Sequence, residues 1–259
     1  MDLKIEKLIE LIKCIKPFFV SHNEAFDIQV KGVADFVTQV DFQVQEMMKN
    51  GLKELYPKVQ FMGEERDNSD IDFQKPVWIL DPVDGTTNLI HDYHQSALSL
   101  ALCVEREIVL GIVYQPYTDE MFLAQRGKGA WLNGSPIHVS GIERLEESLV
   151  AIGTSPWAHD RADENFRVFK EIFLSCTDIR RTGSAAYDLA CVACGRTEAF
   201  VERNLKPWDF SAGLLLVREA GGTVSDYEGG EIDFTGPSDI VAGNGCIGEK
   251  IVEDILKKL

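Results

Sequence analysis

Asp81-Pro82-Val83-Asp84-Gly85-Thr86-Thr87 is the stretch of this 259-residue sequence that says most about its fold and its chemistry. The apolar run before it, Val77-Trp78-Ile79-Leu80, predicts a buried strand. Gly85 then predicts a turn, and the threonine pair predicts the first turn of a helix. A strand that ends in acids and turns into a helix can bind a divalent cation through its carboxylates and a phosphate through free N–H groups.

The patterns on either side of this stretch predict two halves, 1–145 and 146–259. The first half predicts helices over 2–19 and 38–56 and strands near 59–62, 77–81, 95–105, 109–115 and 120–124, with a hairpin at Asn133-Gly134. These strands predict a mostly antiparallel sheet. The second half predicts strands over 148–152, 178–181, 198–202 and 240–242, alternating with helices over 160–174, 184–194, 209–220 and at the end of the chain. This alternation favours an α/β half with a mixed sheet.

The charge of the chain limits the partners that it could bind. With 42 acidic and 26 basic residues, the formal net charge is −16. We therefore expect no direct binding to nucleic acid, which needs a basic surface. An anionic substrate would need a positive group in the site, and a divalent cation would supply it.

The lack of a recognisable targeting signal and the pattern of cysteines predict a cytoplasmic protein. The first twelve residues alternate charged and apolar positions at helical spacing and lack the uncharged core of a signal peptide. No apolar run reaches the length of a membrane span. The six cysteines are expected to be packed thiols. Cys191 and Cys194 form a C-x-x-C pair in an apolar helix with no second ligand pair nearby, which argues against a zinc or redox site.

Three acidic clusters lie where strands or turns end: Glu64-Glu65, Asp81 with Asp84, and Asp209. Each alone is typical of a solvated loop, a turn or a helix cap. If they converge, their repulsion requires cations between them. Ligands that are all oxygen indicate Mg²⁺, with Mn²⁺ as an alternative, because no Cys or His takes part. Two such cations are a known arrangement for phosphate-ester hydrolysis.

The chain resembles the inositol monophosphatase family of Mg²⁺-dependent, lithium-sensitive phosphatases. The resemblance covers essentially the whole chain. Its expected fold is an α+β or α/β protein, a layered αβαβα sandwich with a mostly antiparallel N-terminal half and a mixed-sheet C-terminal half. The matching stretches are Asp35–Asp41, Gly63–Glu65, Trp78–Asn88, Gly127–Ala130, Arg181–Ala186, Trp208–Gly213 and Glu219–Gly222.

The resemblance implies two to three metal ions and a water nucleophile. The implied metal ligands are Glu64, Asp81 and the Val83 carbonyl for the first ion, Asp81, Asp84 and Asp209 for the second, and Glu65 for a weaker third. Thr86 and Glu64 would position the attacking water, and Asp41 would be oriented towards Thr86.

The resemblance also implies a substrate site. The backbone N–H groups of Gly85 and Thr86 would hold the phosphate, and Lys31 aligns with a basic residue near the entrance. The residues implied on the alcohol side are Asp84, Gly183, Ser184, Ala185, Glu202 and Asp209. Family members often have an aromatic-Pro-aromatic stretch after the motif. Here it is Tyr93-His94-Gln95, which leaves the substrate preference open.

The function expected is Mg²⁺-dependent hydrolysis of a small phosphomonoester, inositol 1-phosphate first, by a homodimer with no membrane partner. On the same fold, the substrate could instead be fructose 1,6-bisphosphate, a nucleotide 3′-phosphate, histidinol phosphate or NADP. A bisphosphate would need a second anion site, for which Arg181, Arg203 and Lys206 are candidates. A phosphatase that forms an aspartyl-phosphate uses Asp-x-Asp, one residue shorter than the spacing here. A non-enzymatic role, as regulatory partner of a larger assembly, is a further alternative.

Overall fold

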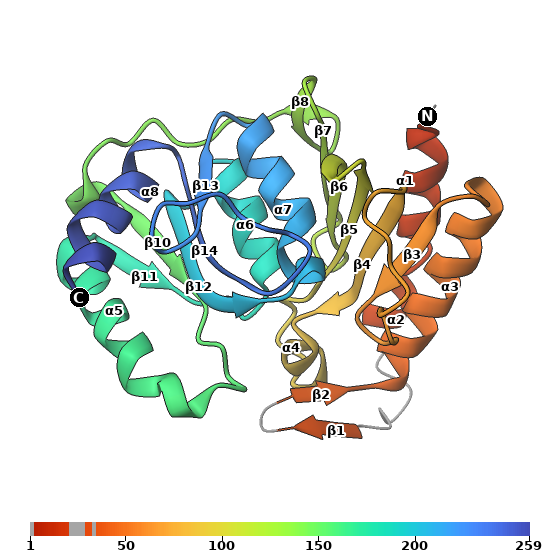
Figure 1. The fold of residues 1–259 in the computed structure, drawn as a ribbon, viewed down its shortest axis with the longest axis horizontal. Coiled ribbons are helices and arrows are strands. Elements are labelled where there is room, and N and C mark those ends of the chain that lie inside the picture. The colour runs from red at the N-terminus through yellow and green to blue at the C-terminus, as the bar shows by residue number, and fades with distance from the viewer. Residues whose placement is uncertain (1–2, 21–28, 33–34) are drawn as a thin grey trace.

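The computed structural model describes residues 3–20, 29–32 and 35–259, which form eight α-helices and three β-sheets (Figure 1). Its helices are α1 (Ile5–Lys13), α2 (Lys16–Val20), α3 (Gln39–Leu55), α4 (Thr86–Ile90), α5 (Ala162–Ser175), α6 (Ala185–Ala193), α7 (Pro207–Glu219) and α8 (Cys246–Lys250). In spatial order, one sheet contains β3 (Gln60–Gly63), β4 (Val77–Asp84), β5 (Ala97–Val104), β6 (Glu107–Gln115), β7 (Glu120–Gln125), β8 (Gly129–Leu132) and β9 (Ser135–Pro136). A second contains β11 (Asp178–Arg180), β10 (Leu149–Ile152), β12 (Ala199–Leu205), β14 (Ser238–Gly243) and β13 (Thr223–Ser225), and a third pairs β1 (Gln29–Gly32) with β2 (Asp35–Val37).

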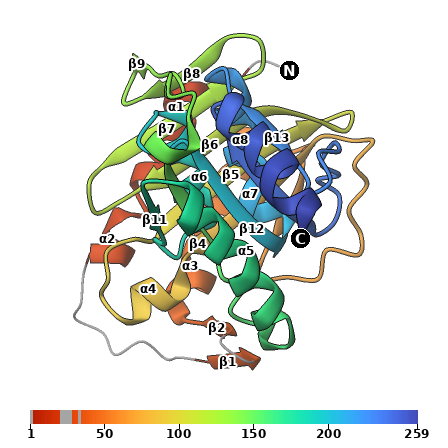
Figure 2. The same cartoon turned by 90° about the vertical axis from the view of Figure 1, so that its left-hand side faces the viewer.

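The elements stack in five layers, which confirms the expected αβαβα sandwich (Figure 1). Helices α1 and α3 cover one face of the seven-stranded sheet, and α6 and α7 lie between that sheet and the five-stranded one. Helices α5 and α8 cover the far face, as the view from that side shows (Figure 2). In the seven-stranded sheet only β3 and β4 pair in parallel. The five-stranded sheet is mixed, as expected.

Strand β5 shows how the sequence selects these layers. Successive side chains of a strand point to opposite faces. Leu98 and Leu100 pack in the cluster that includes α1 and α3. Ala97 and Ala101 face the central helices instead, within a different cluster. Large side chains therefore fill the outer layer, and small ones let α6 and α7 approach the sheet closely.

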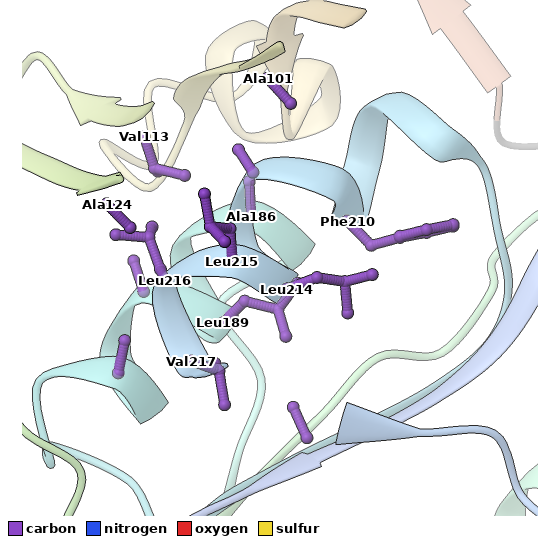
Figure 3. Close-up of a cluster of buried hydrophobic side chains, with 14 of the residues drawn as sticks. Ala101, Val113, Ala124, Ala186, Leu189, Phe210, Leu214, Leu215, Leu216 and Val217 are labelled. Atoms are coloured by element: carbon purple, nitrogen blue, oxygen red, sulfur yellow. The ribbon is translucent and has the colours of Figure 1, made fainter. Parts of the chain in front are cut away.

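Helix α7 is buried between the two large sheets. Phe210, Leu214, Leu215, Leu216 and Val217 are all buried, and Figure 3 shows these side chains leaving the helix in several directions. A helix that is apolar all round must be covered on every side. The inner face of the first sheet is therefore completed by a helix from the later part of the chain.

Three local predictions need correction. The helix predicted over 2–19 is divided into α1 and α2, because Pro17 lacks the N–H that a continuous helix would use. Met1 and Asp2 lie outside the described residues. Asp209 was expected to cap α7, but the helix begins two residues earlier at Pro207 and Lys206 is its N-cap. The strand pair β1–β2 and the strand β13 were not predicted from the sequence.

Several other predictions are confirmed. Thr38 caps α3, Ser184 caps α6, and Asn133 and Gly134 both have the positive φ of the expected hairpin turn. None of the helices in the described ranges is long and apolar enough to cross a membrane. The division into halves at residues 145 and 146 stays a prediction.

Candidate active site

One cavity collects most of the predicted site residues from distant parts of the chain. It is bounded by the ends of β3, β4 and β12 and by the starts of α4, α6 and α7. The predicted residues that line it are Glu64, Asp81, Val83, Asp84, Gly85, Thr86, Gly183, Ser184, Ala185, Glu202 and Asp209. A larger cavity of about 600 Å³, between α5, the end of β12 and the C-terminal residues, contains none of them.

A β-bulge brings the two acids of the motif to one face of the sheet. Asp81 lies opposite Ser99 of β5, and Asp84 lies opposite Ala97. Three steps along β4 therefore match two steps along β5, which is the definition of a bulge. In a regular strand, residues three apart point to opposite faces, so the extra residue is what places both carboxylates on the side of the central helices.

The third acid, Asp209, comes from the first turn of α7. Its Oδ2 accepts a hydrogen bond of 2.7 Å from the N–H of Lys206. The Ser99 hydroxyl donates to the Trp208 carbonyl at 2.9 Å, which ties the start of α7 to β5. The two contacts fix Asp209 beside the strand end that carries the other acids.

Burial makes this group of carboxylates electrostatically costly. Asp81, Asp84 and Asp209 are each less than a tenth exposed. Burial is the first cause that raises the pKa of each, to about 6 for Asp84 and well above the ordinary value for the other two. It also raises the pKa of Glu64 to about 8. Repulsion among the acids raises the pKa of Asp81 and Asp209 further. A positive charge in the cavity would favour the ionised form of all four.

The chemistry of the lining residues fits a hard divalent cation. The lining contains carboxylates and a backbone carbonyl, and within the described part of the chain it contains no His or Cys. That set suits Mg²⁺ or Mn²⁺ better than Zn²⁺. No three His, Cys, Asp or Glu side chains among the described residues form a group that could hold a metal ion as they stand. The acids therefore share one cavity without converging on a common point.

Thr86 and Asp41 form a hydrogen-bonded pair at the edge of the cavity. Asp41 is fully buried, and its Oδ2 accepts from the N–H and the hydroxyl of Thr38 at 2.8 and 2.6 Å. Thr86 Oγ1 lies 2.9 Å from Asp41 Oδ1 and 3.0 Å from the Val83 carbonyl oxygen. A hydroxyl that donates a hydrogen bond to either acceptor keeps lone pairs that can accept a hydrogen bond from water.

The start of α4 presents unused backbone donors to the same cavity. Gly85 has φ +88°, a left-handed conformation that favours glycine. Within the described chain, the N–H groups of Gly85 and Thr86 donate to no protein acceptor. Asn88 donates to the Thr182 carbonyl at 2.9 Å, which holds the segment before α6 against this turn. These two N–H groups could hold oxygen atoms of a phosphate.

Asp84 connects the motif to the start of α6. Its Oδ2 accepts from the Ser184 hydroxyl at 2.6 Å and from the N–H of Ala186 at 2.7 Å. Ser184 also caps α6 by accepting from the N–H of Tyr187 at 3.3 Å. Its hydroxyl is thus already engaged, and direct contacts of Ser184 and Ala185 with substrate stay predictions.

Two of the residues implied as metal ligands or catalytic groups lie outside the lining of the cavity. Asp41 reaches it only through Thr86. The Glu65 carboxylate pairs with Lys31, which also lies 3.6 Å from Glu64. The role of Glu65 as a ligand of a third ion stays a prediction, and Lys31 lies near the acids as the resemblance implies.

Glu202 occupies space that a glycine provides. Its Oε1 accepts from the N–H of Ser155 at 2.9 Å, and burial raises its pKa to about 7. A Cβ built on Gly153 would lie 1.9 Å from the carboxyl carbon of Glu202. Gly153 is therefore the residue that lets this carboxylate face the cavity.

Replacing Gly153 with alanine is expected to displace Glu202 and to lower the free energy of unfolding by about 1–3 kcal/mol, because overpacking strains the neighbouring chain. Chemical denaturation measures this change. Gly141→Ala is the matched control, since nothing lies within 4 Å of its added Cβ. Equal stability of the two variants would contradict the assigned close contact.

Sequence reasoning did not anticipate every residue of the cavity. Asp188, Trp157 and Gly153 also line it. The signal for Asp188 was a single acid within the apolar helix Ala185–Ala193, one turn after the cap. Of the histidines that the structure describes, none lines the cavity, and the His94 ring instead stacks on Tyr117 at 4.6 Å between centroids.

Comparisons with known proteins show which sequences and folds this chain is similar to. The sequence profile of the inositol monophosphatase family matches residues 4–259. An inositol monophosphatase of Dictyostelium discoideum is 34% identical over 100% of this chain and 97% of its own length. The Nus factor SuhB of Escherichia coli (strain K12) is 40% identical over 85% of this chain and 82% of its own. The crystal structure of the extragenic suppressor protein suhB from Bartonella henselae has a TM-score of 0.90 and 36% identity, covering 98% of each chain.

Proposed function

The chain belongs to the inositol monophosphatase family and is a phosphoric monoester hydrolase, and from that premise we propose that it hydrolyses inositol 1-phosphate to inositol and phosphate with the help of Mg²⁺. The observation that carries this proposal is that Asp81, Asp84 and Asp209 line one cavity beside the Thr86–Asp41 pair. No covalent nucleophile is required for this chemistry, since phosphoryl transfer depends mainly on charge neutralisation and positioning.

The metal ligands in this proposal are Glu64, Asp81, the Val83 carbonyl, Asp84 and Asp209, with Glu65 near a third position. When bound, divalent cations neutralise phosphate charge, lower the pKa of water and stabilise the leaving oxygen. All five of the first residues line the same cavity, which supports the assignment.

The chain's own groups would carry out the remaining steps. The N–H groups of Gly85 and Thr86 hold phosphate oxygens. The Thr86 hydroxyl, oriented by Asp41, would accept a hydrogen bond from the attacking water, and the Glu64 carboxylate would position the water and accept its proton. Glu202, which lines the same cavity, would accept hydrogen bonds from hydroxyl groups on the alcohol portion of the substrate.

A phosphate-release screen tests this function. The substrates are inositol 1-phosphate, fructose 1,6-bisphosphate, NADP and adenosine 3′,5′-bisphosphate, each with Mg²⁺ and with a chelator. We expect the highest kcat/KM for inositol 1-phosphate, no turnover with the chelator, and inhibition by millimolar lithium. A clear preference for one of the other esters would replace the proposed substrate, and turnover without divalent cations would reject the proposed chemistry.

Mg²⁺ is expected to raise the melting temperature more at pH 8 than at pH 5. The pKa of Glu64 rises from 4.5 to about 8 in the folded chain without metal, so the fold binds this proton more tightly than the unfolded chain does. Its contribution to stability is present below about pH 4.5 and is lost as the pH rises to about 8. A bound cation offsets that loss, whereas protons compete with it at low pH.

Differential scanning calorimetry at both pH values, with Mg²⁺ or with a chelator, checks this expectation. The Asp209→Asn variant serves as the control with a weakened site. An increase of the same size at both pH values would contradict the assignment of these acids as ligands.

A regulatory binding role is a second candidate, because the chain is 40% identical to a protein named as a Nus factor. A pull-down from a bacterial lysate, repeated with Asp81→Asn and without metal, separates this role from hydrolysis. Partner retention in both cases would support it. The homodimer and the cytoplasmic location stay predictions; sedimentation of the purified protein tests the first of them.

A further inference from the structure

Gln45 is a buried polar residue on α3 that none of the roles above uses. It is 4% exposed and lies four residues after Asp41, so the two side chains leave the helix on the same face. Asp41 contacts Thr86 at the edge of the candidate active site. Helix α3 therefore already orients one group of the proposed site, and Gln45 lies one turn further along the same face.

The side-chain amide of Gln45 makes a pair of hydrogen bonds with the backbone of Glu65. Its Nε2 donates to the Glu65 carbonyl at 3.0 Å, and its Oε1 accepts from the Glu65 N–H at 3.0 Å. Both main-chain polar groups of the residue after Glu64 are thus bound by one side chain. A neutral amide can donate and accept at once, which an ionised carboxylate or an ammonium group cannot do.

A second amide makes the same pair of bonds on the other side of Glu64. Asn68 Nδ2 donates to the Gly63 carbonyl at 2.8 Å, and its Oδ1 accepts from the Gly63 N–H at 3.2 Å. The N–H of Glu64 itself donates to the Leu80 carbonyl at 3.2 Å. The backbone that carries the Glu64 carboxylate is therefore held on both sides and against β4, the strand that contains Asp81.

Gly63 leaves the space that the Gln45 amide occupies. A Cβ built on Gly63 would lie 2.3 Å from Gln45 Oε1. Any larger residue at position 63 would have to displace the amide from the Glu65 backbone. The stretch Gly63-Glu64-Glu65 and Gln45 therefore form one packed unit.

We propose that Gln45 is a positioning residue of the candidate metal site, which holds the backbone of Glu65 so that the Glu64 carboxylate faces the cavity, and thereby sets the affinity for divalent cations. Groups that orient metal ligands from behind typically change metal affinity by about 10- to 100-fold when they are removed. A neutral side chain suits this position, since a further negative charge would add to the repulsion among the buried acids. This inference rests on the proposed metal-dependent function and adds to it the group that orients one ligand.

Binding of Mn²⁺ to the protein without substrate tests the proposal, with free Mn²⁺ measured by electron paramagnetic resonance. Gln45→Met removes both hydrogen bonds and keeps an unbranched side chain of similar length. We expect the dissociation constant for Mn²⁺ to rise about 10- to 100-fold. In turnover of inositol 1-phosphate, the Mg²⁺ concentration that gives half the maximal rate should rise by a similar factor. Because saturating Mg²⁺ offsets the weaker binding, kcat should then stay within about threefold of wild type.

Gln60→Met is the matched control. Gln60 lies at the other end of β3 and makes the same pair of bonds with the backbone of Asp72, at 2.8 and 3.0 Å. Neither Gln60 nor Asp72 lines the candidate active site. We expect this variant to melt at a lower temperature than wild type in a chelator, as Gln45→Met does, but to bind Mn²⁺ within about twofold of wild type.

Gly63→Ala reaches the same contact from the other side, which keeps the proposal testable if the Gln45 variant fails to fold. The added methyl group displaces the Gln45 amide and leaves the rest of that side chain intact. We expect Mn²⁺ to bind more weakly than in wild type. The double variant should bind Mn²⁺ within about threefold of Gln45→Met alone, because both changes remove one interaction.

The outcomes distinguish the inference from the function on which it rests. If Gln45→Met binds Mn²⁺ as wild type does, or if Gln60→Met loses as much affinity, Gln45 has no specific role at the metal site while the phosphatase function stands. If Gln45→Met does not fold, wild-type affinity in Gly63→Ala leads to the same conclusion. If the wild-type protein binds no divalent cation, the proposed metal-dependent function fails and the inference fails with it.

Discussion

Asp81→Asn is expected to lower kcat for phosphate release by about a thousandfold while the fold survives. The amide has one oxygen in place of two and no charge, so the proposed site loses the ligand shared by two cations. Metal ions contribute several kcal/mol of transition-state stabilisation, and about 4 kcal/mol corresponds to a factor of a thousand. Steady-state kinetics with saturating Mg²⁺ measures the change.

Stability measurements give this variant a second readout. Because burial and neighbouring acids raise the pKa of Asp81, its ionised form opposes folding at neutral pH in the absence of cations. Asp81→Asn should therefore melt at or above the wild-type temperature in a chelator. Asp160→Asn, at an exposed position outside the cavity, is the control and should keep full activity. A variant at position 81 that retains most of its turnover would refute the ligand assignment.

Thr86→Val is expected to reduce kcat by about 100- to 1,000-fold with little change in KM. Valine keeps the shape of threonine and removes the oxygen that lies 2.9 Å from Asp41 and 3.0 Å from the Val83 carbonyl. The attacking water would lose the group that positions it, whereas the backbone donors for phosphate remain. Single-turnover kinetics separates this loss in the chemical step from changes in substrate binding.

Two further variants make the Thr86 result specific. Thr86→Ser restores the hydroxyl and should recover activity to within about tenfold of wild type. Thr223→Val removes an exposed hydroxyl on β13, at a residue that does not line the cavity, and should be nearly neutral. If Thr86→Ser were as inactive as Thr86→Val, the loss would come from packing and not from the hydroxyl.

Much of this architecture was predictable from local patterns. The apolar run before Asp81 predicted β4, and the pair Asn133-Gly134 predicted a hairpin, since each depends on residues close in sequence. The layered fold and the candidate site residues came from motif resemblance over the whole chain. The cavity gathers those motifs from β4, α6 and α7, although the chemical roles of the residues remain to be tested.

Other features depend on contacts that no short stretch encodes. The bulge between Asp81 and Asp84 exists only in the pairing with β5, and it decides which face the acids share. The sequence around Asp209 is typical of a helix cap. Pro207 nevertheless starts α7 two residues earlier, because the first helical position needs no N–H. Asp188 looked like one polar residue in an apolar helix, and only the packed structure shows its oxygen without a partner.

The burial of α7 between both sheets has a consequence for how the chain acquires its shape on the ribosome. Small and apolar side chains of β5 to β7 pack against α6 and α7, which are synthesised some 60 or more residues after β7 ends. Until those helices emerge, the inner surface of the first sheet has no cover and is open to aggregation or to chaperones. Completion of the catalytic cavity is therefore a late event, and a nascent chain arrested before residue 207 would have neither Asp209 nor a finished core.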